Sequence, residues 1–141
     1  MRHGKKGRKL NRTASHRKAL MSNLAASLVI HKRIRTTDAK AKEVRSFVER
    51  LVTYAKRDDV HGRRLIIQKI NGILGKKIAN ILIHDIAPIY ENRQGGYTRI
   101  IKLNNRKNDN ASVSILEFVD ITPVVSEVDD MVIETSEAAT E

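Results

Sequence analysis

The distribution of charge along the chain constrains its fold more than any other feature of the sequence. Residues 1–35 contain eleven Lys or Arg and no acidic residue, whereas residues 108–141 contain nine acidic residues and no Lys or Arg. Residues 36–107 contain sixteen basic and seven acidic residues, and the whole chain carries a formal net charge of +11. Because like charges at this density repel one another, the basic start cannot fold compactly without a polyanionic partner.

The sequence divides into three segments. Residues 1–14 contain two glycines and, after Met1, only one sizeable apolar residue, so they are predicted to form an extended basic arm that becomes ordered on binding. Residues 15–119 contain the periodic patterns of helices and strands, and we expect a globular α/β domain there. Residues 120–141 are acidic and rich in small residues, which predicts a disordered tail.

The first helix is predicted from Ser15 onward, because apolar residues recur every four positions at Leu20, Leu24 and Leu28. Thr13 or Ser15 can cap its N-terminus. The opposite side of this helix is expected to face solvent with polar side chains, namely Arg17, Lys18, Ser22 and Asn23.

Three further helices are expected, over residues 38–56, about 58–70 and 76–86. Pro88 should end the last of them, because proline cannot continue a helix. The helix at 38–56 has the clearest pattern, with one apolar stripe along a single face. This stripe consists of Ala41, Val44, Val48, Leu51 and Ala55.

Extended segments are expected on both sides of the helical region. Residues 32–37 lose the helical period and are interpreted as a short strand or an extended link. Residues 97–103 and 112–119 are typical of β-strands, and the polar loop 104–110 between them predicts a hairpin. Each of these two strands contains two adjacent apolar residues, so the sequence does not decide which face is buried. The pairs are Ile100-Ile101 and Ile115-Leu116.

Patterns of catalysis and of metal binding are missing from the sequence. The five histidines show no metal-ligand spacing, and without cysteine neither a disulfide nor a cysteine-based zinc site can form. Gly75-Lys76-Lys77 lacks the spacing of a phosphate-binding loop, and the acidic pair Asp58-Asp59 is interpreted as a helix start. We therefore expect no enzymatic activity, no cofactor, no metal and no small-molecule substrate.

The apolar stretch at residues 20–30 follows a charged start, but polar residues interrupt it and basic residues follow it directly. It is therefore not interpreted as a signal peptide. No run reaches the ~18 apolar residues that a membrane span needs, and the lack of cysteine is typical of a reducing compartment. We expect a soluble, cytoplasmic protein that has no membrane partner.

The charge pattern favours duplex RNA as the polyanion. Duplex RNA is recognised through phosphates, 2′-hydroxyl groups and shape, which require Lys, Arg and backbone donors but few aromatic side chains, and aromatic residues make up only 4% of this chain. A soluble surface ordinarily intersperses charges of both signs, so a merely solvated face is the weaker interpretation of residues 1–35. A DNA-compacting protein is an alternative, although it would more naturally show a dimerising core with duplicated arms. An RNA-modifying enzyme is another alternative, but it would need a cofactor site.

The residues also carry a family resemblance. The segment MRHGKKGRKLNRTASHRKALMSNLAASLVIHKRIRTTDAKAKEVRSFVERLV resembles the N-terminal half of the bacterial large-subunit ribosomal protein L17 family, and IAPIY followed by NRQGGYTRIIKL is similar to a second hallmark of that family. The resemblance covers about residues 1–119. It implies an α/β fold in which a helical layer packs on a small three-stranded mixed sheet, with residues 33–37 as the first strand.

The resemblance further implies a structural constituent of the large ribosomal subunit that supports subunit assembly and translation. Its partners would be large-subunit ribosomal RNA and neighbouring ribosomal proteins near the exit of the nascent-chain tunnel. It implies no catalytic activity and no cofactor.

Carried onto this chain, the resemblance implies RNA contacts in four groups. In the group at residues 93–99, two glycines allow the backbone to approach a phosphate that Arg93 and Arg99 flank. The sequence leaves open whether Tyr97 stacks on a ribose or base or belongs to the core. The expected contacts are Arg2, His3, Lys5, Lys6, Arg8, Lys9 and Arg12 of the arm; His16, Arg17 and Lys18 at the start of the first helix; Arg33, Arg35, Thr36, Thr37, Lys40 and Lys42; and Arg93, Gly95, Tyr97 and Arg99.

The resemblance ends near Val119 and does not explain the acidic tail. Two interpretations of this segment stay open. It shields the basic arm before assembly, or it is a neutral solubilising appendage.

Overall fold

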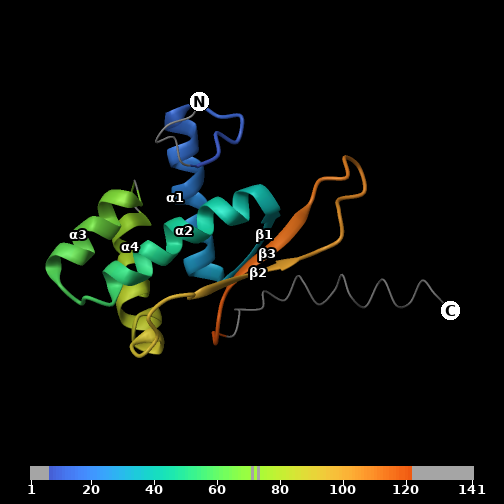
Figure 1. The fold of residues 1–141 in the computed structure, drawn as a ribbon. Coiled ribbons are helices and arrows are strands. Elements are labelled where there is room, and N and C mark those ends of the chain that lie inside the picture. The colour runs from blue at the N-terminus through green and yellow to red at the C-terminus, as the bar shows by residue number, and fades with distance from the viewer. Residues whose placement is uncertain (1–6, 71, 73, 122–141) are drawn as a thin grey trace, which may run out of the picture.

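The computed structural model describes residues 7–70, 72 and 74–121, which form helices at one side and a three-stranded sheet at the other (Figure 1). Residues 1–6 of the predicted arm and residues 122–141 of the predicted tail lie outside the described residues. A π-helical turn, η1 (Leu82–Ile86), and a 3-10 turn, η2 (Pro88–Tyr90), follow the last helix. The other elements are α1 (Ala14–His31), β1 (Arg33–Thr37), α2 (Asp38–Ala55), α3 (Val60–Lys69), α4 (Leu74–Ile81), β2 (Thr98–Lys102) and β3 (Val113–Phe118).

α1 begins one residue before the predicted start, with Thr13 as its N-cap residue but without a side-chain cap hydrogen bond. Its buried side runs through the small residues Ser22, Ala25 and Ala26 and through Leu28 and Val29. The prediction that Ser22 faces solvent was wrong, because this side chain is only 3% exposed. Small side chains on this line allow α1 to pack closely against α2 and α4.

α2 confirms the clearest sequence pattern. Every residue of the predicted stripe is at most 1% exposed, and Val52 is fully buried beside it. α2 contacts all three strands as well as α1 and α3, so it is the central element of the fold. The backbone N–H of Asp38, at its first turn, donates to the carbonyl oxygen of Ser112 at 3.0 Å and ties the helix to the sheet.

α3 and α4 confirm the remaining helices. The carboxylate of Asp59 accepts the backbone N–H of Gly62 and so caps α3, as expected for a helix start. The predicted helix at 76–86 consists of α4 followed by η1, in which the Ala87 N–H donates to the carbonyl oxygen of Leu82 at 2.8 Å. Regular helix ends before Pro88, as expected.

The sheet has the strand order β1-β3-β2, and both pairings are antiparallel. The expectation of a mixed sheet was therefore wrong. β2 and β3 form the predicted hairpin, and β1 pairs with the other edge of β3, so the two strands that run in the same direction are never neighbours. One rung of the register joins Ile34, Leu116 and Ile100, and the next joins Arg33, Glu117 and Arg99.

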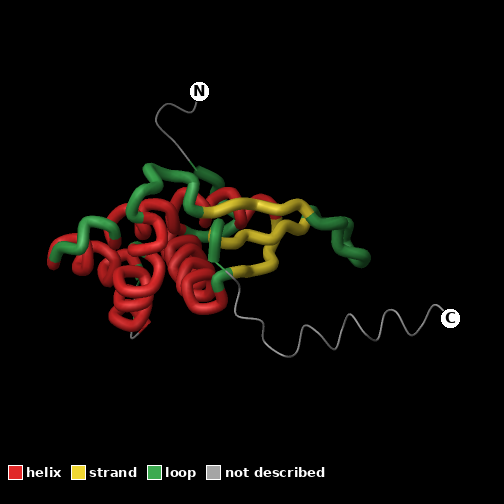
Figure 2. The backbone as a smooth tube through the Cα atoms, turned by 90° about the horizontal axis from the view of Figure 1, so that it is seen from below, coloured by secondary structure: helices red, strands yellow, loops and turns green. Residues whose placement is uncertain are grey.

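The tertiary structure decides the face that the sequence left open. Leu116 is fully buried and Ile100 packs against the core, on the face that contacts α2. Ile101 and Ile115 point the other way, and neither belongs to the core cluster. Figure 2 shows the sheet extending away from the helices toward the loop of the hairpin.

The end of the sheet is closed by aromatic side chains. Tyr90 is 1% exposed, and its ring centroid lies 5.2 Å from that of Tyr97 and 6.4 Å from that of Phe118. Its hydroxyl group donates to the backbone carbonyl oxygens of Val119 and Tyr97. Among the described helices, none has the length and apolar character needed to cross a bilayer.

Candidate nucleic-acid interface

The described part of the arm lies beside α2. Its backbone turns through left-handed conformations at Gly7, Leu10 and Asn11. The guanidinium Nε of Arg8 lies 3.9 Å from the carboxylate of Glu43 in α2, and Arg8, like Lys9 and Arg12, is exposed. The cations at this end of the arm therefore face solvent. The expected contacts Arg2, His3, Lys5 and Lys6 lie outside the described residues.

The first turn of α1 follows the described end of the arm directly (Figure 1). His16 and Lys18 are exposed and Arg17 is partly exposed. The first turn contains no acidic residue. Unpaired backbone N–H groups and the helix dipole give such a helix start a partial positive charge, which favours an anion. The positive side chains at the start of α1 add to this charge.

The turn from β1 into α2 holds the next group. Thr36, Thr37 and Lys40 are partly buried. Lys42 Nζ lies 2.7 Å from the Asp38 carboxylate, which also accepts a hydrogen bond from the Ser114 hydroxyl at 3.3 Å. The hydrogen bond from Lys42 holds the pKa of the Asp38 carboxyl below its usual value, with help from Ser114. The charge of Lys42 is thus compensated locally.

Arg33 and Arg99 share one carboxylate across the sheet. Glu117 lies between them in β3, with its oxygens 3.3 Å from Arg33 Nε and 2.5 Å from Arg99 Nε. Its side chain is 10% exposed, whereas those of Arg33 and Arg99 are 46% and 61% exposed. Arg35, two residues along β1, is also exposed. Three guanidinium groups and one carboxylate leave this part of the surface with two excess positive charges.

The segment before β2 presents an open backbone. Gly95 is exposed, and a Cβ atom placed there would meet nothing within 4 Å. Arg93 Nη1 lies 2.8 Å from the Asp120 carboxylate, and the Arg93 carbonyl oxygen accepts a hydrogen bond from Lys56 Nζ at 2.5 Å. The expected approach of a phosphate to the backbone at Gly95 is therefore sterically open, with Lys56 as a further cation nearby.

Tyr97 belongs to the core. It is 4% exposed, and its ring packs against Tyr90. Its hydroxyl group donates to the Arg93 carbonyl oxygen at 3.3 Å. Of the two interpretations that the sequence left open, the structure favours a core tyrosine. Its hydroxyl group holds the loop at Arg93, and its buried ring is not available to stack on a base.

The expected contacts do not form a single patch. In Figure 1 the described end of the arm and the start of α1 lie at the top, and the segment between η2 and β2 lies at the bottom. β1, with Arg33 and Arg35, joins the lower end of α1 to the start of α2. The cations therefore extend along one dimension of the molecule, as an interface with several segments of RNA would require.

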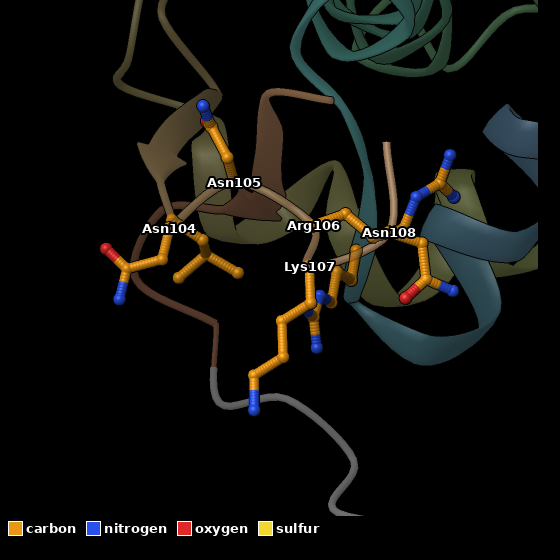
Figure 3. Close-up of a pocket in the computed structure, with 7 residues that line it drawn as sticks. Asn104, Asn105, Arg106, Lys107 and Asn108 are labelled. Atoms are coloured by element: carbon orange, nitrogen blue, oxygen red, sulfur yellow. The ribbon is translucent and has the colours of Figure 1, made fainter. Parts of the chain in front are cut away.

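The structure adds one group that the sequence analysis missed. The loop after β2 lines, together with Arg35 and Leu103, an open cleft of about 560 Å³ (Figure 3). Arg106 in this loop makes two hydrogen bonds with Asp109, at 2.5 and 2.8 Å, which lower the pKa of the Asp109 carboxyl to about 2. Lys107 is exposed and forms no ion pair with any described residue. An Arg-Lys pair within a run of asparagines was the signal for this group.

Within the described part of the chain, no group of three or more His, Cys, Asp or Glu side chains could hold a metal ion. The cleft at the hairpin is lined by amides and cations, and no nucleophile pairs with a base there. The chemistry that this surface offers is the binding of anions.

Comparison with known proteins identifies the family. A family model for ribosomal protein L17 matches residues 20–119. The chain is 53% identical over 120 residues to large ribosomal subunit protein bL17 of Agrobacterium fabrum. This match covers 85% of this chain and 83% of that protein. It is 52% identical over 120 residues to the protein of the same name in Amoebophilus asiaticus. This second match covers 85% of this chain and 60% of that protein. The chain therefore belongs to the ribosomal protein L17 family.

Proposed function

We propose that the chain is a structural constituent of the large ribosomal subunit that binds ribosomal RNA through phosphate and shape contacts. One observation carries this proposal: cations run from the described end of the arm into the first turn of α1, and among the described residues their one ion pair joins Arg8 to Glu43. Relatives more than half identical to the chain are large ribosomal subunit proteins. Membership of a ribosomal protein family also confirms that the chain is not an enzyme.

The RNA contacts differ in the role that we assign to them. The arm, residues 1–14, threads between RNA helices and becomes ordered as its charges meet phosphates. The start of α1 binds a phosphate at its N-terminus. The backbone at Gly95 approaches a further phosphate between Arg93 and Arg99. Tyr97 acts indirectly, because it holds the Arg93 loop from the core.

We divide the chain into the arm, a globular domain over residues 15–119, and the tail over residues 120–141. The core cluster, which begins in α1 and ends at Phe118, supports the extent of the domain. Its partners in this proposal are large-subunit ribosomal RNA and neighbouring ribosomal proteins. Their position near the exit of the nascent-chain tunnel is what the sequence resemblance implies.

Sedimentation of cell extracts tests the proposal. We expect the tagged chain to sediment with large-subunit particles and to remain there after a wash at high salt, because buried RNA contacts are screened less than exposed ones. Release of the chain by the wash would contradict a structural role. Equal affinity for random duplex DNA and for large-subunit RNA at about 150 mM salt would instead favour a DNA-compacting protein.

A further inference from the structure

The sheet has a second face that the core does not use, and we call it the outer face. It is formed by the alternate side chains that point away from α2. The pairing of Arg33 and Arg99 with Glu117 establishes that these three residues share this face. From the register, the outer face comprises Arg33, Arg35 and Thr37 of β1, Val113, Ile115 and Glu117 of β3, and Arg99 and Ile101 of β2 with Leu103 beyond it.

An apolar strip crosses the outer face. Ile101 lies directly opposite Ile115 in the register, and Leu103 donates its N–H to the carbonyl oxygen of Val113 at 2.9 Å. Ile101 is 38% exposed, and Ile115 and Leu103 are partly exposed. Val113 is 7% exposed and forms the buried end of the strip, although none of the four residues belongs to the core cluster. Adjacent apolar side chains on the open face of a sheet are a surface that gains about 25 cal/mol for each Å² that an occupant buries.

Arginines border this strip. Arg33 and Arg99 share the carboxylate of Glu117, and Arg35 forms no ion pair with any described residue. An occupant that suits the whole outer face must therefore combine apolar side chains with negative charge. An RNA backbone would match the arginines but would leave the strip between Ile101 and Ile115 uncovered.

The last twenty residues of the chain have this composition. Residues 122–141 contain six carboxylates, no Lys or Arg, and six valine, isoleucine or methionine side chains, all six within residues 124–133. They also lie beyond the C-terminal end of the family match, which covers residues 20–119.

These residues begin close to the outer face. β3 ends at Phe118, one residue beyond Glu117, and the chain is held there by the Val119 N–H, which donates to the Tyr97 carbonyl oxygen at 3.0 Å. The ion pair between Arg93 and Asp120 is a second anchor. From this point twelve extended residues span up to ~40 Å, whereas a strand of five or six residues is ~17–20 Å long. The tail can therefore cross the whole face.

We propose that in the free protein residues 124–134 dock on the outer face, with their apolar side chains on the strip at Ile101 and Ile115 and their carboxylates beside the arginines. Because the segment is tethered, its effective concentration is on the order of millimolar, so a contact that is weak between separate molecules is populated within one chain. Ribosomal RNA would compete for the same arginines and release the segment. That consequence depends on the proposed function, whereas the docking itself does not.

Paramagnetic labelling of the full-length chain tests the docking. The sequence contains no cysteine, so Ser136→Cys provides one unique site for a spin label just beyond the docked segment. In a methyl-labelled sample without RNA, we expect the Ile101 and Ile115 signals to lose most of their intensity, while Ile66 and Ile78 in the helices keep theirs. Equal broadening of all four signals, or none, would overturn the proposal.

Charge variants identify the interaction and its location. Neutralising the carboxylates of the segment changes no residue of the described domain, and we expect it to restore the Ile101 and Ile115 signals. Changing Arg33, Arg35 and Arg99 to Gln should restore them as well, whereas the matched change of Lys69, Lys76 and Lys77 to Gln should not. Unchanged broadening in the variant that neutralises Glu127, Asp129, Asp130 and Glu134 would overturn the proposal.

A second copy of the chain is the competing occupant. Mixing the spin-labelled chain without isotope label with an isotope-labelled chain without spin label detects it. Broadening of Ile101 and Ile115 in this mixture would show docking between molecules and overturn docking within one chain. No RNA is present in any of these samples, so a failure of RNA binding would leave their result unaffected.

Discussion

Gly62 of α3 lies so close to Tyr54 of α2 that a Cβ atom at Gly62 would stand 2.5 Å from the Tyr54 carbonyl oxygen. The same Cβ atom would stand 2.7 Å from the carboxylate of Asp59, which caps α3. A backbone atom and a capping group therefore occupy the space of a side chain. The close packing of α3 on the end of α2 requires glycine for reasons of space, without any need for an unusual backbone conformation.

We expect Gly62→Ala to destabilise the fold by about 1–3 kcal/mol, because the backbone of α2 or the cap of α3 must shift to admit a methyl group. Denaturation by urea, followed by circular dichroism, measures the change. Gly95→Ala is the matched control and should leave stability nearly unchanged, since nothing lies within 4 Å of a Cβ atom there. Equal midpoints for the two variants would refute the steric explanation.

The substitution Glu117→Gln should lower the stability of the fold and raise its affinity for RNA. The substitution removes the carboxylate that Arg33 and Arg99 share, and the loss of one charge-assisted hydrogen bond from Arg99 and one ion pair with Arg33 at a buried site should cost about 1–3 kcal/mol. The same change raises the excess positive charge of the outer face by one, so we expect tighter binding of ribosomal RNA at low salt. Thermal unfolding and filter binding check the two effects, and weaker RNA binding by a folded variant would contradict the second.

Tyr90 should make stability depend on alkaline pH. Burial raises the pKa of Tyr90 to about 12, from an ordinary value of about 10, with a smaller contribution from Asp120. Below pH ~10 both the folded and the unfolded state hold this proton, and the stabilisation is complete. As pH rises from about 10 to 12 the unfolded state releases the proton first, so the free energy of unfolding falls by at most ~1.4 kcal/mol per pH unit.

Tyr90→Phe provides the comparison. It should lower stability by about 1 kcal/mol at neutral pH, through the lost hydrogen bonds to Val119 and Tyr97, and should make the alkaline decline shallower. Urea unfolding at several alkaline pH values measures both slopes. Parallel slopes for the two proteins would exclude Tyr90 as the source of the decline.

Reversal of charge in the arm should abolish assembly without unfolding the domain. We expect a chain with Lys5, Lys6, Arg8 and Lys9 all changed to Glu to be absent from large-subunit particles in sucrose gradients, because acidic residues would repel the phosphates that we propose the arm to bind. Circular dichroism should still report the helices. The same four reversals at Arg64, Lys69, Lys76 and Lys77, which are exposed on α3 and α4, are the control and should be incorporated normally. Normal incorporation of the arm variant would remove the arm from the interface.

Salt should weaken the binding of the isolated protein to large-subunit RNA. If six to ten cations contact phosphates, the affinity should fall by about 10³–10⁵-fold between about 50 and 200 mM salt, because each contact releases counterions. Titrations at several salt concentrations give the slope. A nearly flat dependence would mean that the basic surface does not carry the binding.

The helices were largely predictable because each depends on local pattern. The stripe of α2 and the Asp59 cap of α3 can be read from neighbouring residues, and the structure has both. Ser22 was misassigned because a small polar residue can be buried where two helices approach closely, and the distance between helices is not encoded in one helix alone. The strand directions were missed for a similar reason, since pairing joins residues as distant as Arg33 and Glu117.

The sequence by itself determined the charge gradient from a basic start to an acidic end, the family, the helix periods and the hairpin. These properties are local or additive, and they do not depend on how the chain is packed. Only the tertiary structure decided that Ile100 and Leu116 are buried while Ile101 and Ile115 form a strip between arginines, and that Tyr97 supports a loop from the core. Successive side chains of a strand point to opposite faces of the sheet, and the pattern of these strands does not distinguish the two faces. The helix that packs against the sheet determines which face is buried.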